Sequence, residues 1–254
     1  DSRKLHFLQI WLPEHSDKEG IGKAILEAVK LIVAVSGTDM PKAKILNRVC
    51  QSMSKMDADD MSKAMLYIES MAESIKYPTF DYVDAELTII EAIKDVLPEK
   101  SKEHLENIYL HIHDLTDNSV KAACLSKLLG KFDDLGPKSE TEKILGCSSV
   151  EIRRDITQLI HQLLSETAYH LKVIEEPIKA LVCNYPTMID ELITEINTVE
   201  RKKRAYSQAA SYYLLKQKEV EINPSYFFEL ISKTDNTYDN RENPLELLSW
   251  MLLY

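Results

Sequence analysis

Apolar residues recur at helical spacing along nearly the whole chain, and this pattern constrains the fold more than any other feature. In the segment 57–76 they stand three or four residues apart, as the buried face of an α-helix requires. A proline follows at position 78, and a second stripe of the same kind runs from residue 80 to 97. Prolines and polar turns separate further stripes, and no stretch alternates as a β-strand does. The sequence therefore predicts an all-α fold.

Glycine is scarce, with only 6 residues among 254. Tight hairpins and phosphate-binding loops depend on glycine, because it adopts backbone angles that other residues avoid. Its scarcity favours helices joined by short connections. Two helices fit within residues 41–76 and two more within 80–115, a length of about 35–40 residues that is typical of helical-pair repeats. We therefore expect antiparallel helical pairs, in which each pair covers the inner face of its neighbours.

Residues 105–135 carry a more specific pattern. A helical stripe ends at Leu115, an acidic turn follows at Asp117, and Val120 and Lys121 lead into a helix that begins with small residues. This order resembles a repeat unit of the HEAT family. The resemblance implies a curved α-solenoid scaffold without chemistry of its own. Outside this segment the pattern departs from the family, so an irregular α-solenoid and a large helical bundle both remain open.

The composition of the chain changes near residue 136. Residues 1–135 form an expected array of helical pairs, and 136–147, which begin with a Gly-Pro break, form a candidate linker. Residues 148–254 form an expected second helical region with longer helices.

Two helix predictions apply to this second region. Ser148 and Glu151 have the spacing of a capping box, in which each side chain satisfies a free amide of the other residue at a helix start. The apolar stripe that begins near Thr187 continues to Leu214, and it predicts one long helix.

Positive charge is concentrated in one run, whereas the chain as a whole carries a net charge of −10. The net charge disfavours nucleic acid, because affinity for phosphates comes from Lys and Arg. The run comprises Arg201, Lys202, Lys203 and Arg204, and we expect it in the middle of the long helix. Such a run commonly forms a solvated helix face. As a binding site it would suit an acidic protein partner, with nucleic acid or an anionic surface as the alternative.

A histidine-rich segment offers a different function. His104, His111, His113 and Asp114 lie within one expected helix, and the doublet His113-Asp114 is similar to that of metal-dependent HD phosphohydrolases, which are all-helical. Adjacent His and Asp side chains can share one metal ion. The competing interpretation is structural, because histidine is favourable at a helix C-terminus and aspartate commonly begins a turn. Since the chain contains no nucleophile or phosphate-binding motif, we expect no catalytic, metal-binding or cofactor-binding residue.

The four cysteines stand far apart without a C-x-x-C pair, so we expect free thiols in the core: Cys50, Cys124, Cys147 and Cys183. Free thiols and the absence of an N-x-[ST] sequon favour an intracellular protein, cytoplasmic or nuclear. The most apolar window, 24–35, is far shorter than the ~20 residues of a membrane span. The methionines between positions 53 and 71 follow helical stripes and are expected in the core.

Both ends of the sequence are apolar, and we expect the chain to be a piece of a longer protein. The leading functional hypothesis is a non-catalytic helical scaffold that mediates protein–protein interaction within a multi-subunit assembly, with other protein subunits as its partners. The metal-dependent phosphohydrolase and the binding of nucleic acid or an anionic surface are the alternatives, and the oligomeric state stays open.

Overall fold

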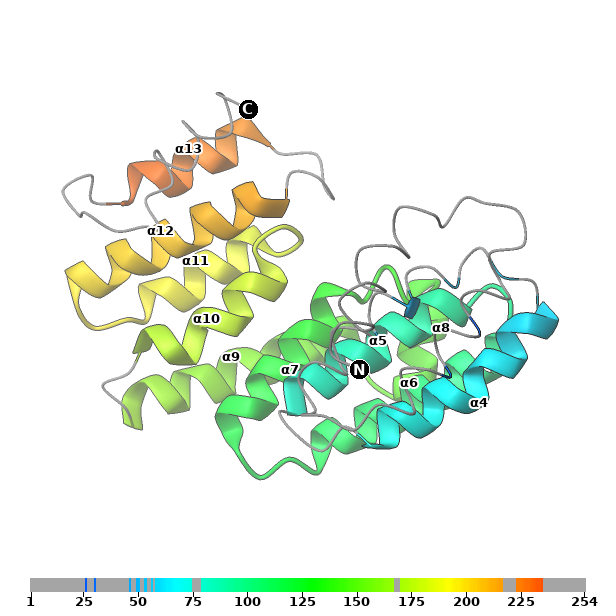
Figure 1. The fold of residues 1–254 in the computed structure, drawn as a ribbon. Helices are drawn as coiled ribbons and strands as arrows, with labels where there is room; N and C mark the ends of the chain where they lie inside the picture. The colour runs from blue at the N-terminus through cyan, green and yellow to red at the C-terminus, as the bar shows by residue number, and fades with distance from the viewer. Residues whose placement is uncertain are drawn as a thin grey trace. The chain divides into compact units, whose positions relative to one another are not determined.

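The computed structural model describes residues 58–74, 79–166, 170–216 and 223–234, and seven single residues: Leu26, Lys30, Leu46, Val49, Cys50, Met53 and Met56. The regular structure of these residues is entirely helical (Figure 1). The helices are α4 (Ala58–Ser74), α5 (Thr79–Ile93), α6 (Pro98–His113), α7 (Asn118–Gly130), α8 (Lys138–Leu145), α9 (Ser149–Glu166), α10 (His170–Leu181), α11 (Pro186–Thr194), α12 (Val199–Leu215) and α13 (Pro224–Ser232). The prediction of an all-α fold is confirmed. Such an array is compatible with a helical-repeat scaffold.

The helices group into two compact units that are not contiguous in sequence. Unit 1 comprises residues 1–114 and 131–147, and unit 2 comprises 115–130 and 148–254. These bounds differ from the division expected near residue 136, because α7 packs on α9 and α10, which follow it in the chain. The candidate linker also contains a helix, α8, which packs on α6.

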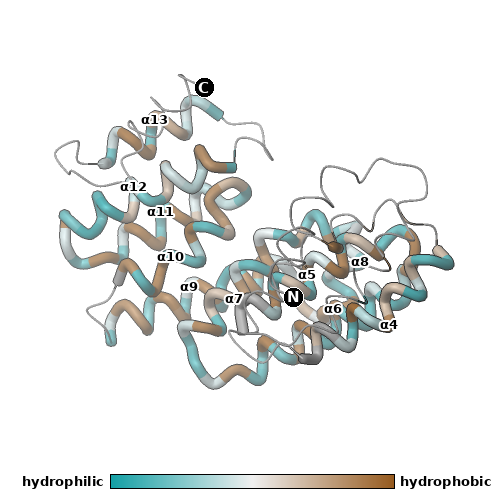
Figure 2. The backbone as a smooth tube through the Cα atoms, in the orientation of Figure 1, coloured by the Kyte–Doolittle hydropathy of each residue, from teal (hydrophilic) through white to brown (hydrophobic). Residues whose placement is uncertain are grey.

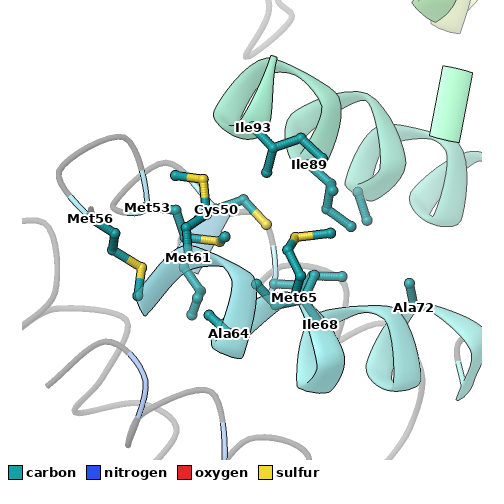
Figure 3. Packing of buried hydrophobic residues seen from close by; sticks show 13 residues of the cluster. Cys50, Met53, Met56, Met61, Ala64, Met65, Ile68, Ala72, Ile89 and Ile93 are labelled. Carbon is teal, nitrogen blue, oxygen red and sulfur yellow. The ribbon is translucent and has the colours of Figure 1, made fainter. Parts of the chain in front are cut away.

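The core of unit 1 gathers around α4 and α5, and α5 also packs on α6. Met61 and Met65 of α4 point toward Ile89 and Ile93 of α5, with Cys50 beside them (Figure 3). The methionines expected in the core are buried at positions 53, 56, 61 and 65. The side chain of Met71 lies outside the described residues, as do the apolar window 24–35, apart from Leu26 and Lys30, and both ends of the chain.

The starts of α6, α7 and α9 follow local signals of the sequence. Pro98 occupies the first turn of α6, where a missing N–H costs nothing. Asp117 Oδ1 accepts hydrogen bonds from the amides of Ser119 and Val120, at 2.8 and 3.1 Å, and so caps α7.

The predicted capping box at the start of α9 is confirmed. The amide of Ser148 donates to Glu151 Oε2 at 2.7 Å, and the amide of Glu151 donates to Ser148 Oγ at 3.2 Å. The hydrogen bonds from the Ser148 amide and hydroxyl lower the pKa of the Glu151 carboxyl.

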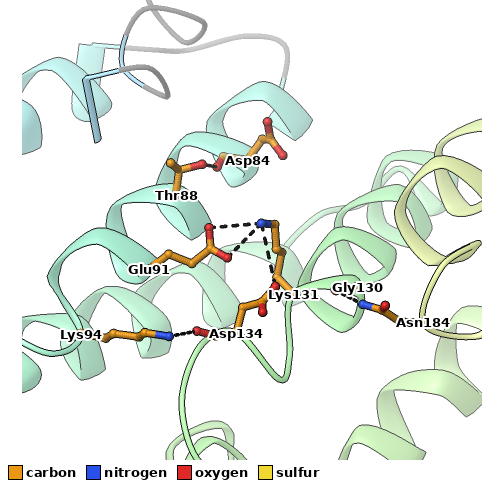
Figure 4. A network of polar contacts seen from close by, with 8 residues as sticks. All are labelled: Asp84, Thr88, Glu91, Lys94, Gly130, Lys131, Asp134 and Asn184. Carbon is orange, nitrogen blue, oxygen red and sulfur yellow. Dashed lines mark hydrogen bonds and ion pairs between the residues drawn. The ribbon is translucent and has the colours of Figure 1, made fainter. Parts of the chain in front are cut away.

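An ion-pair network attaches the segment after α7 to α5 within unit 1. Lys131 Nζ donates to both carboxylate oxygens of Glu91, at 2.9 and 3.2 Å, and lies 4.0 Å from Asp134 (Figure 4). Lys94 Nζ donates to the backbone carbonyl of Asp134. These contacts hold the segment that leads from Lys131 to α8.

The prediction of one long helix after Thr187 is wrong. The structure has two helices, because α11 ends at Thr194 and α12 begins at Val199. Thr198 is extended, with φ −116° and ψ 140°, and its β-branched neighbour Val199 has a low helix propensity. The buried stripe also stops there, since Ile196 is buried whereas Val199 is 63% exposed.

Two helices of unit 2 approach each other closely at Gly130, the last residue of α7. A Cβ atom at this position would overlap the backbone carbonyl oxygen of Ala180 in α10. Asn184 Nδ2 donates to the carbonyl of Gly130 at 2.9 Å and closes the contact (Figure 4). The close packing of α7 on α10 therefore requires glycine at this position.

Gly130→Ala is expected to destabilise the protein by about 1–3 kcal/mol, the usual cost of overpacking. This loss occurs although alanine forms helices better than glycine by about 1 kcal/mol. The free energy of unfolding in urea measures it. The control is Gly146→Asn, since Gly146 has φ +65° and open space around it and asparagine tolerates this conformation. A Gly130→Ala protein as stable as the wild type would contradict the assigned packing.

Candidate functional site

The basic run occupies the first two turns of α12, and the expectation that it lies in the middle of a helix is wrong. The helix begins only two residues before Arg201, because the chain breaks between α11 and α12. Arg204 is exposed, and Arg201, Lys202 and Lys203 are half-buried. Figure 2 shows the hydrophilic start of this helix.

The part of α12 that follows the basic run has an apolar face, which fixes the helix in unit 2. Its buried residues pack on α10 and α13 and include Ala205, Ala209, Ala210, Tyr213 and Leu214. All five positions follow helical spacing, so one face of α12 is covered along residues 205–214. The basic run is therefore attached to a packed helix.

A polar network joins α12 to α11 and α13 just after the basic run. Tyr206 donates its hydroxyl proton to Asp190 Oδ1 at 2.6 Å, and Lys233 Nζ donates to the same oxygen at 2.6 Å. The Lys233 ammonium also lies 5.0 Å from the centroid of the Tyr206 ring and 2.9 Å from Glu229. The Asp190 carboxylate thus accepts hydrogen bonds from α12 and from the residue that follows α13.

This network shifts the pKa values of its members. Burial opposes ionisation of Asp190, but the hydrogen bonds from Lys233 and Tyr206 outweigh it and lower the pKa of the carboxyl. Burial, and then the hydrogen bond to Asp190, raise the pKa of the Tyr206 hydroxyl. Burial disfavours the charged form of Lys233, yet its bonds to Asp190 and Glu229 raise the pKa of its ammonium. The network keeps Asp190 negative and Lys233 positive, as a structural anchor requires.

The position of the basic run is unfavourable for helix stability. The N-terminal end of a helix carries a partial positive charge, which repels Arg and Lys and favours a residue such as Glu200. Helix stability therefore does not account for four consecutive cations at this end of α12. Two of the four, Lys203 and Arg204, have interactions within the structure.

A shallow groove of about 600 Å³ lies between α9 and α11 in the same unit. Arg153 Nη2 contacts Glu191 at 3.1 Å, and His161 Nδ1 contacts Glu195 at 3.1 Å, across the two helices. Val150, which is 69% exposed, lies at the start of α9 and lines the groove. The sequence did not predict the groove, because pairs 34 and 38 residues apart carry no periodic signal.

The structure does not bring the four residues of the histidine-rich segment to one point. His104 pairs with carboxylates of α4 and α5, whereas the His111 ring packs edge-on against Tyr82, with centroids 5.3 Å apart. His113 packs edge-on against Tyr109, with centroids 4.6 Å apart, and Asp114 is the C-cap of α6.

Across the described residues, no three His, Cys, Asp or Glu side chains converge as a metal site would require. Cys50 and Cys124 are buried thiols outside any disulfide, as predicted, whereas the thiols of Cys147 and Cys183, also outside any disulfide, are only half-buried. Burial raises the pKa of the Cys124 thiol to about 12.

No protein family, curated protein or solved structure matches this chain. Among the described residues, no helix is both long and apolar enough to cross a membrane.

Asp190→Asn is expected to lower the free energy of unfolding by about 1 kcal/mol at pH 7, since the half-exposed ion pair with Lys233 is partly screened. The lowered pKa of Asp190 means that its contribution is present above about pH 4, the usual pKa of an unfolded aspartate, and is lost as the pH falls through the folded value. Urea unfolding at pH 7 and at about pH 2 measures the difference. Asp155→Asn, at a loose surface pair with Arg154, is the control. A difference of the same size at both pH values would contradict the assigned role.

Proposed function

We propose that this chain is a non-catalytic helical scaffold and that the start of α12 binds an acidic protein partner. The observation that carries the proposal is the run of four cations, Arg201 to Arg204, on a helix end that is held by its own packed face. Positive charge on a fixed surface speeds association with a negative partner and excludes positive ones.

The residue types of the run, a groove of the same unit and the net charge support a protein as the partner. Arginine is enriched at the centres of protein interfaces, where its planar head binds carboxylates. The groove between α9 and α11 belongs to the same unit and adds the exposed side chain of Val150. The net charge of −10 would repel the phosphates of a nucleic acid outside the local patch.

The scaffold part of the proposal is supported by the helical architecture. Each unit is an assembly of packed helices. In arrays of this kind the helices present extended surfaces to other proteins. We propose that the chain acts in this way within a larger assembly, as an irregular α-solenoid.

The test neutralises two cations of α12 in the double variant Lys202→Ala with Arg204→Ala. Binding to fluorescently labelled polyglutamate, an acidic polypeptide probe, is measured by anisotropy at two salt concentrations. The dissociation constant is expected to rise by about three- to tenfold, because each of these partly or fully exposed charges contributes up to about 1 kcal/mol. The salt dependence of binding is expected to decrease in parallel.

The matched control removes the same charge from the exposed face of α8, in Lys138→Ala with Lys143→Ala. The control is expected to bind the probe as the wild type does. The same three proteins are then used as bait in extracts of cells that make the protein. A partner that is retained by the wild type and the control, and lost by the α12 variant, supports the proposal. Equal binding by all three, or tighter binding to duplex DNA than to polyglutamate, would refute it.

A further inference from the structure

The side chain of His104 lies between two carboxylates from two other helices of unit 1. Its Nδ1 atom is 2.7 Å from Glu86 Oε2 of α5, and its Nε2 atom is 3.5 Å from Glu69 Oε1 of α4. The Glu86 side chain is only 6% exposed and that of His104 only 15%. The imidazole therefore joins α6 to both neighbouring helices in a largely buried position.

The protonation state of an imidazole decides how many of these contacts it can make. Only the doubly protonated cation donates from both ring nitrogens, whereas the neutral ring has one N–H and one lone pair. A lone pair that faces a carboxylate oxygen is repelled by it. A neutral His104 can therefore keep one carboxylate contact and must lose the other.

When the His104 ring loses one proton, the N–H that faces Glu86 is retained and the one that faces Glu69 is lost. The reason is that the contact with Glu86 is shorter and more buried. A buried carboxylate without a donor is costly, and His104 supplies the hydrogen bond to Glu86. Glu69 is 32% exposed and also accepts from Lys100 Nζ at 2.7 Å. The contact between His104 and Glu69 is therefore the first to be lost on deprotonation.

We propose that His104 is a pH-sensitive clamp, which contacts Glu69 of α4 and Glu86 of α5 when its imidazole is a cation and releases Glu69 when it becomes neutral, so that Lys100 alone then pairs α6 with Glu69. The clamp lies in unit 1, whereas the basic run lies in unit 2, so each can be tested without the other.

The charged groups around the clamp come from each packed element. Glu69 faces it from α4 and Glu86 from α5, while Lys100 of α6 reaches it through Glu69. Cys50 lies near Glu86, and its thiol has a raised pKa, because of burial and then because of the Glu86 charge.

Helix α8 also packs on α6, and its Glu140 pairs with Lys102 at 3.2 Å. Among the described side chains, the carboxylates of Glu69 and Glu86 thus contact the imidazole, and the Lys100 ammonium contacts Glu69.

The direction of the pH effect follows from the pKa of His104. Burial lowers this pKa, but the hydrogen bonds and charges of Glu86 and Glu69 outweigh burial and raise it. A raised folded pKa means that the stabilisation is fully present below about pH 6.5, the ordinary histidine value. It is lost as the pH rises through the folded value. The clamp is thus closed at acid pH and loosens at alkaline pH.

Two NMR measurements on the whole chain test the clamp between about pH 5 and pH 9. The first follows the 13C-labelled histidine rings, and one ring, absent from His104→Gln, is expected to titrate above about pH 6.5. The second follows amide hydrogen exchange, corrected for the intrinsic rate at each pH. The protection of α4 amides is expected to fall by about threefold or more as His104 loses its proton.

Glu69→Gln separates the clamp from a general pH effect. This variant is expected to lower the pKa of the His104 ring and to make the protection of α4 independent of pH. If His104→Gln does not fold, Glu69→Gln still identifies the His104 signal, because it shifts the ring that Glu69 contacts. The control is Glu195→Gln at the exposed pair with His161 of unit 2, which is expected to leave α4 unchanged.

Three results would overturn the proposal. The first is a His104 ring that titrates at or below about pH 6.5. The second is protection of α4 that does not change with pH in the wild type. The third is a Glu69→Gln protein with the same pH profile as the wild type.

Discussion

Burial of apolar side chains between packed helices is the constraint on which both units depend. A large aliphatic side chain that leaves water contributes about 1.5–3 kcal/mol, more than any single polar contact at the surface. Met61, Met65 and Ile68 of α4 are completely buried in unit 1, and Ile156 and Ile160 of α9 are completely buried in unit 2. Which helices become neighbours is therefore decided first by these apolar side chains. Where two backbones come very close, as at Gly130, even a methyl group is excluded.

Two polar networks, one in each unit, occupy positions where three elements meet. In unit 1 His104 of α6 lies between carboxylates of α4 and α5. In unit 2 Asp190 of α11 accepts from Tyr206 of α12 and from Lys233, which follows α13. A buried charge such as that of Glu86 is tolerated only with a partner, so the His104 network favours one arrangement of the surrounding helices. The two networks differ in their response to pH, because histidine changes its charge near neutral pH, whereas lysine and aspartate do not.

Local signals allowed several helix ends to be predicted from the sequence. Pro98, Asp117 and Ser148 act through backbone amides within three residues of themselves, so their effect does not depend on the rest of the fold. The break between α11 and α12 was missed because the apolar spacing continues through Val199, although that residue is exposed. This error also misplaced the basic run, since its position along α12 follows from where the helix begins.

The sequence by itself determined the helical class, several helix starts and the existence of one basic run, because these depend on residues that are close in the chain. Only the tertiary structure decided that α7 packs on α9 and α10 and that Asn184 closes the contact at Gly130. It also decided that the His104 ring lies between Glu69 and Glu86 and that His111 and His113 pack against tyrosines. The contact between Asp190 and Lys233 joins residues 43 positions apart. Contacts of this kind have no periodic signature, because they arise only when separate helices are packed together.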